Sequence, residues 1–133
     1  MLFDFSTLKL NDDAPIYQQV IRFVKVGIAL GEAKSGDELP SRRMLSVLLG
    51  VNPNTIQKCC RIMEDEGFLL SQSGAKSVLS FDNDMAESMK RTLYIEETQR
   101  YIGEMKRLRL GKEEVVDLMD KFWSQQEDDE DLR

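Results

Sequence analysis

The chain has 133 residues, of which 41% are hydrophobic and 32% are charged, and its formal net charge is −6. This length and apolar content suffice for a small folded core, so a wholly disordered chain is excluded. Histidine is absent, and no phosphate loop, nucleophile motif or metal-spaced cluster occurs, so an enzyme is not expected and neither a cofactor nor a metal ion is predicted.

The acidity is confined to one part of the sequence. Residues 1–80 hold nine basic and nine acidic side chains, whereas residues 81–133 hold nine basic and fifteen acidic ones. Binding to phosphates depends on local basic groups, so the overall charge is no argument against a nucleic-acid partner. No apolar run is long enough to cross a bilayer and no signal peptide is recognisable, so we expect a cytoplasmic protein without a membrane partner.

The first third of the chain predicts an extended arm, a helix and a very short strand. Residues 1–13 lack a period, and Leu2, Phe3, Phe5 and Leu8 are expected to dock on the rest of the fold. Pro15 is a good helix start, and apolar residues follow at helical spacing until Gly31. Residues 34–37 form a turn, and only residues 38–40 remain for a strand.

The next stretch, residues 39–69, predicts a helix-turn-helix. Ser41 is a suitable N-cap for a helix that Gly50 ends, and Asn52 followed by Pro53 begins a second helix. Four apolar residues of the first helix fall at helical spacing: Met44, Leu45, Leu48 and Leu49. The second helix has an inward stripe of Ile56, Cys59, Cys60 and Met63.

The exposed first turn of the second helix is expected to read DNA. It presents Asn54, Thr55, Gln57 and Lys58, which are short hydrogen-bonding groups and one cation. A recognition helix, here residues 52–66, brings such groups into the major groove. Arg42 and Arg43 are cations at the positive end of the preceding helix, which indicates a purpose beyond helix stability, and we expect them on DNA as well.

Cys59 and Cys60 are adjacent on this helix, so a disulfide between them is not expected. Free cysteine is often buried, and the two side chains are interpreted as small core residues. A redox sensor is the alternative.

Two short apolar runs, residues 68–70 and 78–81, predict a β-hairpin with a wing at residues 71–80. Gly74, Lys76 and Ser77 would lie at its tip and follow the DNA backbone. Helix, short strand, two helices and a hairpin is the order of a winged helix.

The remainder predicts two helices that cannot enclose a core by themselves. The first runs from Asp84 to Gly111, and the second includes residues 113–123. Their apolar rows are expected to form a dimer interface that contains Met85, Met89, Leu93, Tyr94, Tyr101, Met105, Leu108, Leu118 and Phe122. Folding back onto the first domain is the alternative.

Four segments of the chain resemble the winged-helix domain of the GntR family of bacterial transcriptional regulators, over about half of its length. They are PIYQQV (15–20), GDELPSRRML (36–45), GVNPNTIQKC (50–59) and EDEGFL (64–69). The short remainder leaves no room for a large effector domain and looks most like the YtrA subfamily, whose members dimerise through two C-terminal helices.

The resemblance implies DNA contacts at particular residues. Arg43 matches the family's PSxR arginine, and Asn52, Asn54, Thr55 and Gln57 match its recognition-helix turn. The wing keeps one glycine and the lysine of the family's tip but lacks the second glycine. No ligand site carries over, because the histidine-containing domain of larger relatives is missing, so an effector stays unknown.

These observations together predict a mainly α fold with a small β-hairpin. A winged helix-turn-helix DNA-binding domain with its arm (1–81) precedes a two-helix dimerisation region (82–126) and an acidic, disordered tail (127–133). The predicted function is a homodimeric repressor of an adjacent operon that binds double-stranded DNA at an inverted-repeat operator. The alternative is a winged-helix protein-interaction module that does not bind specific DNA.

Overall fold

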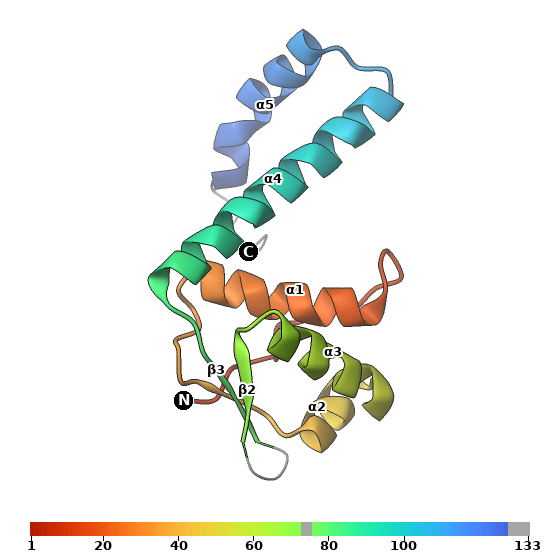
Figure 1. Cartoon of the computed structure of the whole chain (residues 1–133). Coiled ribbons are helices and arrows are strands. Elements are labelled where there is room, and N and C mark those ends of the chain that lie inside the picture. The colour runs from red at the N-terminus through yellow and green to blue at the C-terminus, as the bar shows by residue number, and fades with distance from the viewer. Residues whose placement is uncertain (73–75, 128–133) are drawn as a thin grey trace. The chain divides into compact units, whose positions relative to one another are not determined.

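The computed structural model describes residues 1–72 and 76–127, and the chain divides into two compact units. The first unit runs from Met1 to Leu93 and the second starts at Tyr94. The first unit contains α1 (Ile16–Ala29), β1 (Glu38–Leu39), α2 (Arg42–Leu49), α3 (Pro53–Asp65), β2 (Leu69–Ser71) and β3 (Ser77–Leu79) (Figure 1). This is the predicted order, and the winged-helix fold is confirmed.

The two helices of the helix-turn-helix begin where their caps were predicted. The Ser41 side chain accepts a hydrogen bond of 3.1 Å from the Met44 N–H at the start of α2. The Asn52 side chain accepts one of 2.8 Å from the Asn54 N–H at the start of α3. Each cap satisfies a backbone donor that the helix itself leaves without a partner.

The core lies where α3 packs against α1 and α2. The inward stripe of α3 is confirmed, because Ile56, Cys59, Cys60 and Met63 are all buried. The apolar residues of α2 divide differently: Leu45 is buried and Leu49 partly so, whereas Met44 and Leu48 are exposed. An eight-residue helix that packs through one face can bury only part of such a set.

The wing is part of a three-stranded antiparallel sheet in the order β1-β3-β2. The N-terminal arm extends this sheet, because the Phe3 N–H donates to the Glu38 carbonyl and the Glu38 N–H donates to the Met1 carbonyl, both at 2.7 Å. Phe3 and Phe5 are buried beside Phe23, with ring centroids 4.9 to 5.8 Å apart. The predicted docking of the arm is therefore confirmed for these two residues.

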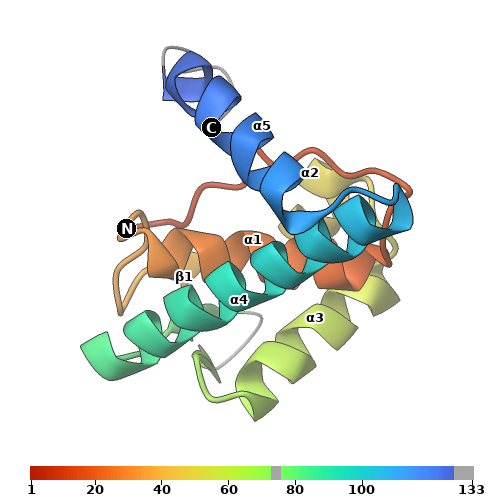
Figure 2. The ribbon, with the colours of Figure 1, turned by 90° about the horizontal axis from the view of Figure 1, so that it is seen from above.

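The rest of the arm lies closer to the surface. Leu8 is partly buried against the core, but Leu2, which was also expected to dock, is 60% exposed. From the N-terminus the arm runs toward α2 and then turns back to the start of α1 (Figure 2).

Helix α4 (Asn83–Arg107) begins in the first unit and continues into the second, which also holds α5 (Lys112–Glu127). Met85 and Met89 pack, partly buried, against the winged-helix core of their own chain. These contacts lie within the first unit, and the dimer interface predicted for Met85 and Met89 stays a prediction. The structure describes nothing beyond Glu127 of the acidic tail.

The part of α4 in the second unit and α5 carry many exposed apolar side chains. Those that are 37% to 69% exposed are Tyr94, Ile95, Tyr101, Ile102, Leu108, Val116, Leu118, Met119, Phe122 and Trp123. Leu93 and Met105 are partly buried. Within the described ranges, no helix combines the length and the apolar composition that crossing a bilayer requires.

Candidate nucleic-acid interface

The first turns of α3 present the side chains that were expected to read DNA. Asn54, Gln57 and Lys58 are exposed and Thr55 is partly exposed. Ile56, in the middle of this group, is completely buried and anchors the turn to the core. The backbone of the turn is thus held rigidly while its polar side chains face solvent, as groups that meet base edges must.

Lys58 has a contact within the chain that the sequence did not indicate. Its ammonium nitrogen lies 3.8 Å from the centroid of the Tyr17 ring, which belongs to α1. This is a cation–π contact, and it directs an otherwise flexible side chain along the α1–α3 junction. Tyr17 is one of the apolar residues that follow Pro15 at helical spacing, and a contact between two helices leaves no local signal in the sequence.

The neighbouring arginines of α2 have different surroundings. Arg43 is exposed and forms no ion pair with any described residue. Arg42 is partly buried, and its guanidinium lies 3.2 Å from both the Glu64 carboxylate and the Ser71 hydroxyl. Arg43 therefore has the position expected of a DNA contact, whereas Arg42 is engaged inside the molecule.

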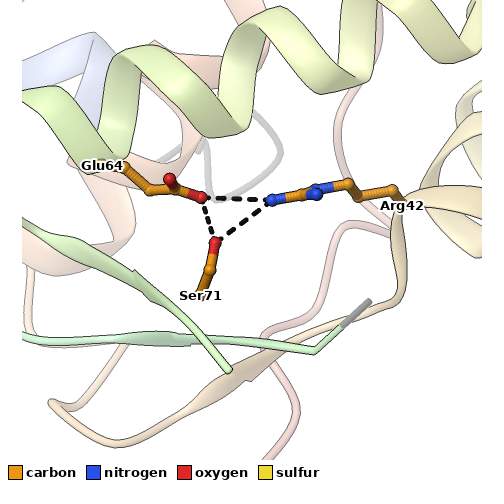
Figure 3. A network of polar contacts seen from close by, with 3 residues as sticks. All are labelled: Arg42, Glu64 and Ser71. Atoms are coloured by element: carbon orange, nitrogen blue, oxygen red, sulfur yellow. Dashed lines mark hydrogen bonds and ion pairs between the residues drawn. The ribbon is translucent and has the colours of Figure 1, made fainter. Parts of the chain in front are cut away.

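Arg42, Glu64 and Ser71 form a closed triangle of polar contacts, because the Ser71 hydroxyl also donates to the Glu64 carboxylate (Figure 3). The three residues come from α2, α3 and β2. The triangle thus connects both helices of the helix-turn-helix to the first strand of the wing. Sequence reasoning missed Glu64 and Ser71, which are separated from Arg42 by more than twenty residues.

The two cysteines lie in the core, and Cys60 is beside Arg42 of this network. Burial raises the pKa of the Cys59 thiol to about 11. Burial also raises the pKa of Cys60, and the Arg42 side chain partly opposes that shift. Thiols that are buried and protonated are poor nucleophiles, so the geometry favours the packing interpretation over the redox sensor.

The residues predicted at the tip of the wing differ in their exposure to solvent. Lys76 is exposed, and its ammonium group lies 3.3 Å from the Glu38 carboxylate of β1. Ser77 was expected at the tip, but it is 2% exposed and begins β3, so it is not available to DNA. Its hydroxyl has no hydrogen-bond partner among the described residues. Gly74 lies outside the described residues.

In residues 1–72 and 76–127, no three cysteine or carboxylate side chains gather closely enough to hold a metal ion.

Comparisons with known proteins give this surface a context. No family model matches the chain. It is 31% identical over 114 residues to YhcF of Bacillus subtilis, an uncharacterized HTH-type transcriptional regulator. This match covers 86% of this chain and 94% of YhcF. It is 37% identical over 83 residues to the HTH-type transcriptional repressor YtrA of Bacillus subtilis. This match covers 62% of this chain and 59% of YtrA.

Among solved structures, a GntR family transcriptional regulator from Listeria monocytogenes superposes with a TM-score of 0.72. It is 29% identical, and the match covers 84% of this chain and 98% of the other. The match to YhcF spans nearly the whole of both chains, and it includes the helix-turn-helix and wing described above. The chain therefore belongs to the GntR family of HTH-type transcriptional regulators.

Proposed function

We propose that this regulator is a homodimeric repressor that binds an inverted-repeat operator. The recognition helix α3 enters the major groove, and the β2–β3 wing follows the phosphate backbone beside it. The observation that carries the proposal is the first turn of α3, where Asn54 and Gln57 are exposed on a backbone that the Asn52 cap and buried Ile56 hold in place. Such a surface fits base edges better than a flexible loop does.

The chemistry of each exposed side chain indicates whether it suits a base edge or a phosphate. The amide of Gln57 can donate and accept hydrogen bonds at once, which matches the N6 and N7 groups of adenine. Arg43, which has no partner among the described residues, suits a phosphate or a guanine. We therefore assign sequence reading to α3 and positioning on the backbone to Arg43 and Lys76.

The repressor role is supported by the similarity to YtrA, which is named a transcriptional repressor. Dimerisation is supported by the exposed apolar side chains of the second unit, because two helices alone cannot enclose a core and need a partner surface to bury such side chains. Two-fold symmetry of a dimer requires an operator with inverted half-sites about one or two helical turns apart.

The test compares Gln57→Ala with the wild type on two duplexes, an operator selected from a random library and a random sequence. Fluorescence anisotropy measures both affinities over a range of salt concentrations. We expect the loss of a base contact to cost about 1–3 kcal/mol on the operator and almost nothing on random DNA. Gln99→Ala, which removes an exposed glutamine of α4, serves as the control and should leave both affinities unchanged.

An unchanged ratio of the two affinities in Gln57→Ala would show that Gln57 is only a solvated helix residue. A second candidate function is a protein-interaction module, which the exposure of Met44, Val47 and Leu48 on α2 favours. Wild-type protein that binds neither duplex at low salt would support that candidate instead.

A further inference from the structure

The wing lysine is already paired with an acid that the sequence did not single out. The Lys76 ammonium group lies 3.3 Å from the Glu38 carboxylate, and the two side chains are 61% and 42% exposed. The backbone of Glu38 is held firmly in the sheet, since its N–H and its carbonyl both form 2.7 Å hydrogen bonds to the N-terminal arm. Glu38 therefore starts from a fixed backbone position beside the wing, with its carboxylate within reach of Lys76.

The Lys76–Glu38 pair is more exposed to solvent than the contacts of Arg42 on the same surface. Arg42 is partly buried in its triangle with Glu64 and Ser71. A phosphate could therefore bind Arg42 only by replacing the Glu64 carboxylate and breaking that network. Lys76 and its partner are both open to solvent, so the ammonium group can exchange the carboxylate for another anion. A DNA phosphate that approaches the wing meets Glu38 as a direct competitor.

We propose that Glu38 limits the affinity of the wing for DNA by holding the Lys76 ammonium group that a backbone phosphate otherwise binds. This inference rests on the proposed DNA-binding function. Phosphates are present in every duplex and carry no base identity, so the competition lowers affinity for operator and random DNA by the same factor. Glu38 thus sets the strength of binding, and α3 sets its specificity.

The size of the effect follows from the exposure of the pair. Exposed ion pairs change an equilibrium by a factor of about 1.5 to 5. Removing the Glu38 charge also removes its repulsion of the phosphates, which acts in the same direction. We expect Glu38→Gln to tighten binding to both duplexes about twofold to fivefold at low salt.

The experiment is a double-mutant cycle in the full-length protein, measured by anisotropy on a labelled random-sequence duplex and on the selected operator. It uses the wild type, Glu38→Gln, Lys76→Met and the double variant. Glu66→Gln is the matched control, because it removes one acid that forms a 2.8 Å ion pair with Lys25 at the far end of α3. Thermal denaturation of each variant confirms that the fold is intact.

Glu38→Gln is expected to bind more tightly than Glu66→Gln on both duplexes, and the gain should be clearly smaller when Lys76 is replaced by methionine, because only the loss of repulsion then remains. A gain that is equally large without Lys76, or one no larger than the control's, overturns the inference but leaves DNA binding intact. A wild-type protein that binds no duplex at all overturns the proposed function, and this inference with it.

Discussion

A single residue decides how each helix ends, and α2 illustrates the usual solution. The Val51 N–H donates to the Ser46 carbonyl, and the Gly50 N–H donates to the Val47 carbonyl, which is the Schellman arrangement. Gly50 has a φ of 63°, in the left-handed region where glycine meets no steric cost. The sequence therefore predicted this helix end correctly.

Helix α4 ends in the same arrangement with an unusual residue. The Leu110 N–H donates to the Met105 carbonyl and the Arg109 N–H donates to the Lys106 carbonyl. Arg109 has a φ of 66° and is the only non-glycine residue with a positive φ in the described ranges. The predicted end at Gly111 was wrong, because the hydrogen bonds close two residues earlier and force an arginine into the left-handed region.

Substitutions at these two helix ends should change the stability of the protein in opposite directions. Arg109→Gly should stabilise the protein by about 1 kcal/mol, because glycine removes the steric cost of the left-handed backbone. Gly50→Ala should destabilise it by a similar amount for the same reason. Urea denaturation followed by circular dichroism measures both changes. A free energy of unfolding that stays the same or falls in Arg109→Gly would disprove the account of this turn.

At the scale of elements, the triangle of Arg42, Glu64 and Ser71 connects the helix-turn-helix to the wing. It explains why two adjacent arginines of one helix have different roles. Arg42 connects three elements, whereas Arg43 is exposed, and we propose that it contacts DNA.

Arg42→Met and Arg43→Met form a matched pair that separates folding from binding. Arg42→Met should lower the free energy of unfolding by about 1 kcal/mol, because it leaves the partly buried Glu64 carboxylate without its cation. Arg43→Met should change stability by less than about 0.5 kcal/mol. It should instead reduce the log–log salt dependence of DNA binding by about 0.9, the effect of one phosphate contact.

Urea denaturation and salt titrations on the same preparations provide both readouts. If Arg42→Met lowers the salt dependence while stability is unchanged, then Arg42 is a phosphate contact after all. The triangle would then open when the protein binds DNA.

At the scale of the whole molecule, the exposed apolar side chains of the second unit predict a homodimer. Phe122 is 43% exposed on α5, within the set that includes Leu118 and Met119. Phe122→Asp should convert a dimer at micromolar concentration into a monomer, because burying an unpaired carboxylate in an apolar interface is costly. Light scattering on the full-length protein measures the mass.

Leu30→Asp is the control for this prediction. Leu30 is 59% exposed at the end of α1 in the first unit, and its replacement should leave the dimer intact. A wild-type protein that is monomeric, or a Phe122→Asp protein that stays dimeric, would contradict the proposed interface.

The order of the elements, the caps of α2 and α3 and the buried stripe of α3 could all be predicted from the amino-acid sequence. Each of these features depends on residues within a few positions of one another, such as Asn52 with Asn54, so local chemistry suffices to predict them. The exposed turn that carries Asn54 and Gln57 followed from the same local pattern.

The folded structure was needed to learn which cations of the proposed DNA-binding surface already have partners within the chain. Glu38, Glu64 and Tyr17 pair with Lys76, Arg42 and Lys58 across 22 to 41 positions of sequence. It also packed Met85 and Met89, partly buried, against the core of their own chain and buried Ser77 in β3. The physical reason is the same in each case: these contacts form between elements that are distant in sequence, and helical or strand periodicity reports which face is apolar but not what packs against it.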